Sequence, residues 1–144
     1  MTDGNGLPLA VHLTAGQRHE STCFEQVVQS VRVYQPRGRP RWRPHGLAGD
    51  KAYSNPRIRQ WLRQHGIKAI IPQKSDEIRR HRGRPIKFDR DAYRQRNVVE
   101  RCIGWLKEYR RIATRYEKLA INYLGMLKLA MLKKYLACAF PNRA

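Results

Sequence analysis

Two acidic side chains in this sequence stand where they could act on a phosphate group. Asp50 directly follows the short apolar run 46–49, and Glu100 lies in the middle of the segment Tyr93–Lys107. In two-metal phosphoryl transfer, carboxylates hold two Mg²⁺ ions about 4 Å apart, so that one ion activates the attacking oxygen and the other stabilises the leaving oxygen. Each acid has a cation beside it, which would offset the crowding of negative charge. Two acids this far apart in sequence are compatible with such chemistry but do not identify it.

The segment Tyr93–Lys107 predicts a single amphipathic helix, which Asp89 or Asp91 can cap. At 100° per residue, its polar residues fall within about 60° of one another on one stripe. These residues are Tyr93, Arg96, Glu100 and Lys107. The opposite, apolar face is formed by Val98, Cys102, Trp105, Tyr109 and Ile112. Glu100 is then either a reactive acid on the polar stripe or a solvated glutamate paired with Arg96.

The net charge of the chain limits its partners. A formal charge of +19 arises from 30 Lys and Arg residues against 11 Asp and Glu residues in 144 residues. Solubility alone requires a net charge of about 2 to 8 in a small domain. A larger excess favours polyanions, because each neutralised phosphate releases counterions. The composition therefore predicts contact with nucleic acid.

Two segments, at about 35–45 and 73–90, are rich in cations and predict extended basic loops. Both contain the quartet Arg-Gly-Arg-Pro, at 37–40 and at 82–85. Such a quartet either enters a narrow A·T minor groove, whose negative potential attracts arginine, or makes plain phosphate contacts. Trp42, in the first loop, either stacks on a base or sugar or covers the domain edge. The DNA-contacting residues predicted from these loops are Arg37, Arg39, Arg82 and Arg84.

The remaining apolar pattern predicts an α/β fold. The turn signal 3–6 precedes an alternating run at 7–13, which predicts a hairpin whose other strand lies upstream. A helix is expected at about 22–33. After the helix at 93–107, the nearly all-apolar segment 119–140 predicts a second long helix that is buried on all sides.

A strand–helix–strand pattern in the middle of the chain positions Asp50. Short apolar runs at 46–49 and 67–71 flank a helix that Ser54 or Asn55 can cap. This spacing predicts a parallel βαβ unit. Binding sites of such units gather beyond the carboxyl ends of the strands, where Asp50 would lie. The same position also suits an ordinary cap or turn aspartate.

Neither the cysteines nor the C-terminal apolar segment indicates export or membrane insertion. The segment 119–140 contains three lysines, each of which would cost a few kcal/mol at the centre of a bilayer. The cysteines lie far apart and predict buried thiols in a reducing compartment, without a disulfide set or a zinc site. They are Cys23, Cys102 and Cys138.

The spacing Tyr93-x2-Arg96-x3-Glu100-x6-Lys107 resembles the Y-(2)-R-(3)-E-(6)-K signature of DDE transposases from bacterial insertion sequences, the insertion-sequence four/five group. LAGDKAYSN around Asp50 is similar to the second-acid segment of that group. NVVERCIGWLKEYRRIATRYEK is similar to its third-acid segment, and TDGNGLPLAVHLTAGQRHES to the hairpin of its catalytic sheet. The resemblance covers nearly the whole chain.

The resemblance implies an RNase H-like domain that cuts transposon ends and joins the 3′-hydroxyl to target DNA with Mg²⁺ or Mn²⁺. Asp50 and Glu100 would be the second and third catalytic acids and ligands of the metal ions. Arg96 and Lys107 would bind DNA phosphates, and Tyr93 would contact DNA or support the helix. The implied partners are the double-stranded terminal repeats and the target DNA. The full-length enzyme would be a homo-oligomer in the bacterial cytoplasm, at the nucleoid.

The first acid of this family lies upstream of the hairpin. Residues 1–144 are therefore expected to form the C-terminal part of a catalytic domain, a partial RNase H-like fold without the first strand of its sheet. A two-metal site is expected only when that first Asp is supplied, and the isolated chain is expected to be marginally stable and inactive. The alternatives are a non-catalytic basic DNA-binding protein or transposase remnant, and a ribosomal-type RNA-binding protein.

Overall fold

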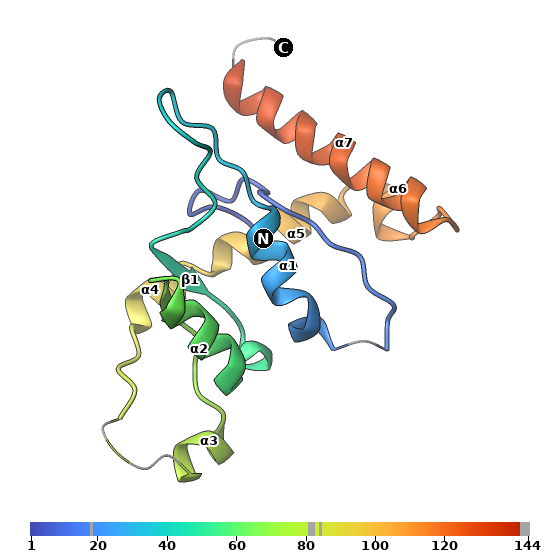
Figure 1. Cartoon of the computed structure of the whole chain (residues 1–144). Helices are drawn as coiled ribbons and strands as arrows, with labels where there is room; N and C mark the ends of the chain where they lie inside the picture. Colours follow the sequence, from blue (N-terminus) through green and yellow to red (C-terminus); the bar gives the residue numbers. More distant parts are fainter. Residues whose placement is uncertain (18, 81–82, 84, 142–144) are drawn as a thin grey trace. The chain divides into compact units, whose positions relative to one another are not determined.

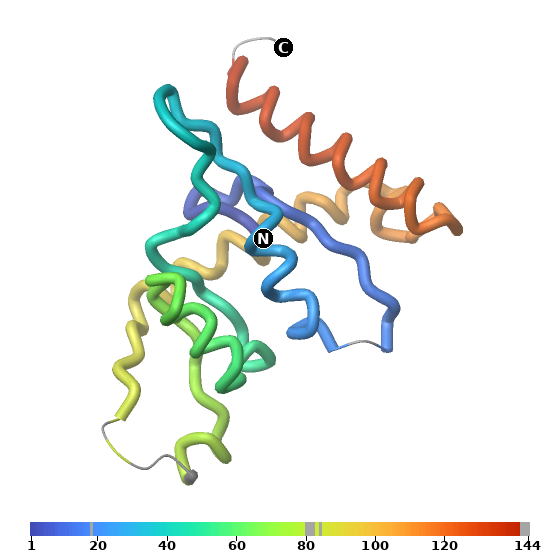
Figure 2. The backbone as a smooth tube through the Cα atoms, viewed as in Figure 1, coloured from blue at the N-terminus to red at the C-terminus, as the bar shows by residue number. Residues whose placement is uncertain are grey.

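A computed structural model describes residues 1–17, 19–80, 83 and 85–141. The chain divides into two compact units. Unit 1 combines Met1–Leu13 with Asn97–Ala144, and unit 2 is Thr14–Arg96. Figures 1 and 2 follow the chain through both units. The described residues form helices and a small parallel sheet, so the α/β class is confirmed at this level.

Unit 2 contains the βαβ unit expected from the sequence. Strand β1 (Gly46–Ala48) pairs in parallel with β2 (Lys68–Ile70), and Leu47 lies opposite Ala69. The connection runs through a 3₁₀ turn, η2 (Lys51–Tyr53), and helix α2 (Pro56–Gln64). Asn55 caps α2 by accepting a hydrogen bond from the Arg57 N–H at 2.9 Å. The described sheet consists of these two strands.

Helix α2 supplies much of the unit 2 core through one apolar face. Leu62 is fully buried, and Trp61 meets the ring of Phe24 edge-on at 5.9 Å. Phe24 begins α1 (Phe24–Ser30), which follows the 3₁₀ turn η1 (Glu20–Cys23). The predicted helix at 22–33 is thus shorter than expected and begins with a 3₁₀ turn. The buried apolar residues of unit 2 are Cys23, Phe24, Val28, Val31, Ile58, Trp61, Leu62, Ile67 and Ile71.

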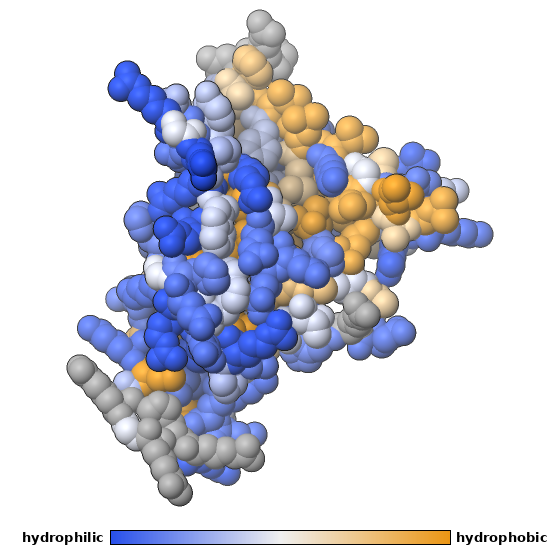
Figure 3. Space-filling view, in the orientation of Figure 1, coloured by the Kyte–Doolittle hydropathy of each residue, from blue (hydrophilic) through white to orange (hydrophobic). Residues whose placement is uncertain are grey.

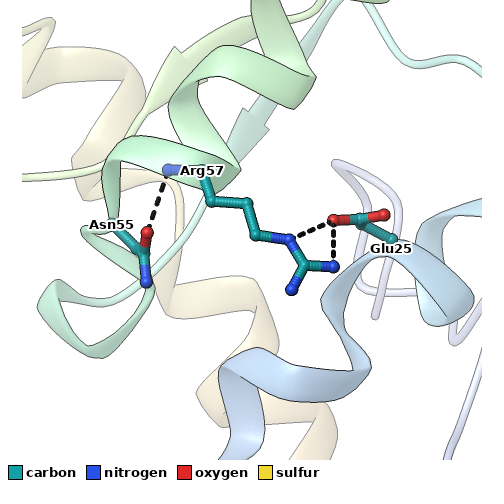
Figure 4. A network of polar contacts seen from close by, with 3 residues as sticks. All are labelled: Glu25, Asn55 and Arg57. Atoms are coloured by element: carbon teal, nitrogen blue, oxygen red, sulfur yellow. Dashed lines mark hydrogen bonds and ion pairs between the residues drawn. The ribbon is translucent and has the colours of Figure 1, made fainter.

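Polar contacts connect the helices of unit 2. The Arg57 guanidinium donates from Nε and Nη2 to Glu25 Oε1, at 3.0 and 2.9 Å, and so links α2 to α1 (Figure 4). Because the Arg57 side chain is largely exposed, this pair contributes only about 0.2–1 kcal/mol. The Arg59 guanidinium donates to Ser54 Oγ and to the Ile71 carbonyl, both at 2.9 Å, at the end of the sheet.

The last part of unit 2 contains α3 (Ser75–Arg80) and α4 (Arg90–Arg94). The prediction of an extended loop over 73–90 is therefore wrong for its first part, which forms α3. Asp89 caps α4 as predicted, since its Oδ1 accepts from the Ala92 N–H at 3.0 Å. Its Oδ2 pairs with Lys68 Nζ at 2.7 Å, which connects α4 to β2. The hydrogen bond from Lys68 makes the largest contribution to lowering the pKa of Asp89 below its usual value, and the hydrogen bond from the Ala92 N–H makes the next largest.

Unit 1 contains α5 (Asn97–Lys107), α6 (Arg110–Ala113) and α7 (Ala120–Ala139). Helix α7 agrees with the helix predicted at 119–140, whereas α5 covers only the later part of the helix predicted at 93–107. At the N-terminus, Asp3 Oδ1 accepts from the N–H groups of Asn5 and Leu7, so Asp3 is a turn residue as expected. The run 7–13 does not form the predicted strand, because it contributes only an isolated antiparallel bridge between Thr2 and Pro8.

The prediction that the last helix is buried on all sides is wrong for this chain. Of α7, only Leu127 and Ala130 are buried, and they form a small core with Ile112. Tyr135 Oη also donates to the Pro8 carbonyl at 3.0 Å. The opposite surface is apolar and exposed, as the orange region along α7 in Figure 3 shows. Within the described residues, no helix is long and apolar enough to span a bilayer.

We expect Leu62→Ala to lower the free energy of unfolding by about 2–5 kcal/mol, because it leaves a cavity at a fully buried position of α2. Arg63→Ala is the matched control, since Arg63 is the exposed neighbour in the same helix and its loss should change stability by less than about 0.5 kcal/mol. Urea denaturation of both variants measures the difference. Equal midpoints for Leu62→Ala and the wild-type chain would contradict the assignment of α2 to the core.

Candidate functional site

Asp50 lies directly beyond the carboxyl end of β1, as the sequence predicts. The Gly49 N–H still donates to the Ile70 carbonyl at 3.2 Å, so the sheet contacts end one residue before Asp50. Asp50 is exposed, and its Oδ1 accepts from the Lys51 N–H as the cap of η2. Asp50 is therefore also an ordinary cap residue, which was the alternative interpretation of this position. A carboxylate accepts about four hydrogen bonds, so Asp50 keeps capacity for a further ligand.

Tyr53 and Glu20 fix the turn that follows Asp50. Tyr53 Oη donates to Glu20 Oε2 at 3.2 Å, which joins η2 to η1. Burial raises the pKa of Tyr53 to about 12, with further contributions from the charge and hydrogen bond of Glu20 and from the charge of Asp50. Sequence reasoning did not single out either residue, because no local pattern pairs positions 20 and 53.

Glu100 lies on an exposed face of α5 together with Gly104 and Lys107. At 100° per residue, Lys107 lies about 20° and Gly104 about 40° from Glu100 around the helix. A Cβ added to Gly104 would meet nothing within 4 Å. Cys102, on the opposite face, is buried as predicted. The polar stripe is therefore present from Glu100 to Lys107.

The single helix predicted for 93–107 is wrong, because it is interrupted between α4 and α5. Gln95 and Arg96 form a turn in which the Arg96 N–H donates to the Tyr93 carbonyl at 2.9 Å. This three-residue step is tighter than an α-helical turn, so the regular spacing of 100° per residue does not continue through it. The Arg96 guanidinium also lies over the Tyr93 ring, 5.5 Å from its centroid. Tyr93 and Arg96 are thus brought together within unit 2.

The stripe residues belong to both units. Glu100 and Lys107 lie in unit 1, whereas Tyr93, Arg96 and Asp50 lie in unit 2. The structure brings together Tyr93 with Arg96, and places Glu100 beside Lys107 on one face. In the part of the chain that is described, no group of three or more His, Cys, Asp or Glu side chains is arranged to hold a metal ion.

The first basic loop lies in unit 2 and forms a hairpin. Val33 and Arg41 exchange two backbone hydrogen bonds of 2.8 Å, and Arg37 and Arg39 lie in the exposed loop between them. Trp42 packs against Trp61, with ring centroids 6.3 Å apart, so it covers the edge of the core as one of the two interpretations proposed. In the second loop, the predicted Arg82 and Arg84 lie outside the described residues.

Comparison with known proteins identifies the class to which these features belong. The family described as a transposase DDE domain matches residues 1–132. The chain therefore belongs to the family of DDE transposase domains, as its signature suggested.

A similar protein supports the assignment to this family. A protein of Burkholderia cepacia, named as a putative transposase for insertion sequence element IS402, is 32% identical to the chain over 130 residues. The match covers 90% of this chain and 57% of the relative, so the chain spans little more than half of that relative's length. No solved structure matches the chain significantly.

We expect the Tyr53 phenol to make the folded chain less stable as the pH rises from about 10 to about 12. The pKa of Tyr53 in the folded chain lies above the ordinary value of 10.0. Below pH 10 the phenol is neutral in both states, and its contribution to the free energy of unfolding is complete. Above pH 10 the phenol ionises first in the unfolded chain, so this contribution is lost as the pH rises. Urea denaturation at pH 9 and 11 should show a smaller loss for Tyr53→Phe than for the wild-type chain. Tyr34→Phe is the control, since Tyr34 is 81% exposed. An identical loss in Tyr53→Phe and the wild-type chain would contradict the pKa assignment.

Proposed function

We propose that this chain acts in DNA transposition, as the part of a DDE transposase that carries the second and third catalytic acids. The observation that carries the proposal is the family signature on α5, where Glu100 and Lys107 share one exposed face. Asp50, beyond the carboxyl end of β1, occupies the position where α/β units hold their ligands. The proposed domain is RNase H-like, with the described βαβ unit as part of its sheet.

Each signature residue takes a role that suits its chemistry. Lys107 and Arg96 bind phosphates of the DNA strand, and Tyr93 supports the Arg96 guanidinium through the contact of 5.5 Å. Gly104 leaves open space between Glu100 and Lys107, through which a phosphate group can approach. The substrates proposed are the double-stranded ends of an insertion sequence and its target DNA, within the bacterial cytoplasm. The complete enzyme is proposed to act as a homo-oligomer.

Asp50 and Glu100 are suited to Mg²⁺ or Mn²⁺. Both are exposed carboxylates, and Mg²⁺ is typically bound by one or two carboxylates while it keeps several waters. The bound ions would supply activation of the attacking oxygen and stabilisation of the leaving oxygen. Asp50 remains oriented through its cap of η2, and η2 is held by the contact between Tyr53 and Glu20.

A third carboxylate is needed for the two-metal site of this family. We propose that it comes from outside these 144 residues, and that the 144-residue chain alone binds DNA without cutting it. The second candidate function is a non-catalytic basic DNA-binding protein. The observation that favours it is the charge of +19, which supports DNA binding whether or not the acids act.

Gly104→Leu tests the approach of DNA to α5. Glycine is less favourable than alanine in a helix interior by roughly 0.8–1 kcal/mol, whereas leucine ranks close to alanine, and the site is open, so the variant should be at least as stable as the wild-type chain. We expect it to bind duplex DNA several-fold more weakly in a fluorescence anisotropy titration, because leucine occupies the space of the phosphate. Gly125→Leu is the control, since Gly125 is likewise a glycine within a helix, α7, with open space around its Cβ position. Unchanged DNA binding by Gly104→Leu would show that this face of α5 does not contact DNA.

Asp50→Asn and Glu100→Gln distinguish the two candidate functions. In the complete transposase, each should abolish Mg²⁺-dependent cleavage of insertion-sequence ends, with DNA binding kept or strengthened because a negative charge is removed. In the 144-residue chain, Mg²⁺ should strengthen DNA binding of the wild type more than that of either variant. Asp76→Asn, at an exposed acid of α3, is the matched control.

Three outcomes would contradict this proposal. Undiminished Mg²⁺-dependent cleavage in both variants of the complete protein would show that Asp50 and Glu100 are not catalytic acids, and a complete wild-type protein that binds but does not cleave the ends would favour the non-catalytic function. Cleavage by the 144-residue chain that is lost in Glu100→Gln would show that no outside carboxylate is required.

A further inference from the structure

The loop at residues 33–41, called the arginine hairpin below, is closed at its base and open at its tip. Two backbone hydrogen bonds of 2.8 Å join Val33 and Arg41 at the base. Both residues form an antiparallel bridge, and the seven residues between them form the loop. The chain at the base is therefore fixed, which lowers the entropic cost of presenting the tip to a ligand.

The arginines of this region serve two different purposes. Arg41 Nε donates to the Arg43 carbonyl at 2.9 Å, and Arg43 donates to the His65 carbonyl at 3.4 Å, so these two hold the base against the end of α2. Arg37 and Arg39, at the tip, are exposed and have no hydrogen-bond or ion-pair partner among the described residues. Their guanidinium groups are therefore available to a ligand.

The base of the arginine hairpin rests on the core of unit 2. The Trp42 ring lies 6.3 Å from Trp61 and 5.5 Å from His65, measured between ring centroids. Trp61 is a buried residue of α2. A groove of about 610 Å³ runs between the hairpin and the end of α2, lined by the four arginines together with His65 and Gly66. The hairpin is thus a supported projection with a cationic side.

The charge of the arginine hairpin is not balanced locally in sequence. Between Glu25 and Asp50 the sequence contains five arginines and no acidic residue. A cationic projection of this kind selects a polyanion, and the proposed function supplies duplex DNA as that polyanion. The inference rests on that proposal and specifies which part of the duplex the hairpin enters.

The shape of the tip favours insertion into a groove of DNA over contact with the phosphates on the outside of the duplex. Gly38 has a φ of +91°, in the left-handed region, and a Cβ there would meet nothing within 4 Å, so the tip is a thin reversal without a side chain at its centre. Pro36 and Pro40 on its two sides lack the backbone N–H that commonly binds phosphate. Two arginines beside a bare turn match a groove about 6 Å wide, and narrow A·T-rich minor grooves attract inserted arginine.

We propose that the arginine hairpin inserts Arg37 and Arg39 into the narrow minor groove of A·T-rich duplex DNA. The guanidinium groups donate hydrogen bonds to adenine N3 and thymine O2, the acceptors of that groove. Arg41 and Arg43 stay with the protein and hold the base. G·C pairs are disfavoured because the guanine amino group projects into the same groove.

Binding of the 144-residue chain to three labelled duplexes of equal length tests the insertion into the minor groove. The first duplex has a central A·T tract, the second has a central G·C tract, and the third is the second with inosine in place of guanine. Inosine lacks the minor-groove amino group and keeps the major-groove edge of guanine. We expect the A·T and inosine duplexes to bind roughly tenfold more tightly than the G·C duplex, by fluorescence anisotropy. The double variant Arg37→Lys/Arg39→Lys keeps the charge and should bind all three duplexes within about twofold of one another.

Arg63→Lys, at an exposed arginine of α2, is the matched control and should keep the preference. Equal binding of all three duplexes by the wild-type chain would overturn the minor-groove inference and leave duplex binding intact. A preference that persists in Arg37→Lys/Arg39→Lys would also overturn it, since another part of the chain would then be responsible. No duplex binding, or stronger binding of RNA, would instead overturn the proposed function.

Discussion

The packing of the apolar face of α2 is the interaction on which the positions of Asp50 and the arginine hairpin in unit 2 depend. Leu62 and Ile58 are buried in the core, and Trp61 contacts both Phe24 of α1 and Trp42. The same helix connects the two strands, so its position fixes where β1 ends and where Asp50 begins the next turn. Asp50 and the arginine hairpin therefore share one support.

Several of the acidic side chains form ion pairs or hydrogen bonds with other groups of the chain. Glu25 pairs with Arg57, Asp89 caps α4 and pairs with Lys68, and Asp3 holds its own turn. Because 11 acids stand against 30 Lys and Arg residues, most cations have no acid to neutralise them. The net charge is consequently strongly positive, and such a charge favours polyanions such as the phosphates of nucleic acid.

Much of the site could be predicted from local pattern, because it depends on short-range geometry. The alternation of apolar runs with a capped helix was enough to place Asp50 at the end of β1. The spacing of Glu100 and Lys107 placed both on one face of α5. Glu20 could not be found in this way, because its contact with Tyr53 joins residues that are 33 positions apart.

The sequence by itself determined the family, the cationic character and the positions of Asp50 and Glu100 within their elements, since each depends on residue type and local period. Only the tertiary structure shows that the segment 93–107 is interrupted at Gln95–Arg96, where the Arg96 N–H donates to the Tyr93 carbonyl three residues before it. It also decided that Trp42 packs on Trp61 and that α7 leaves an apolar face exposed. The packing of Trp42 and the exposure of α7 depend on which surfaces meet in three dimensions, and periodicity carries no information about a partner distant in sequence.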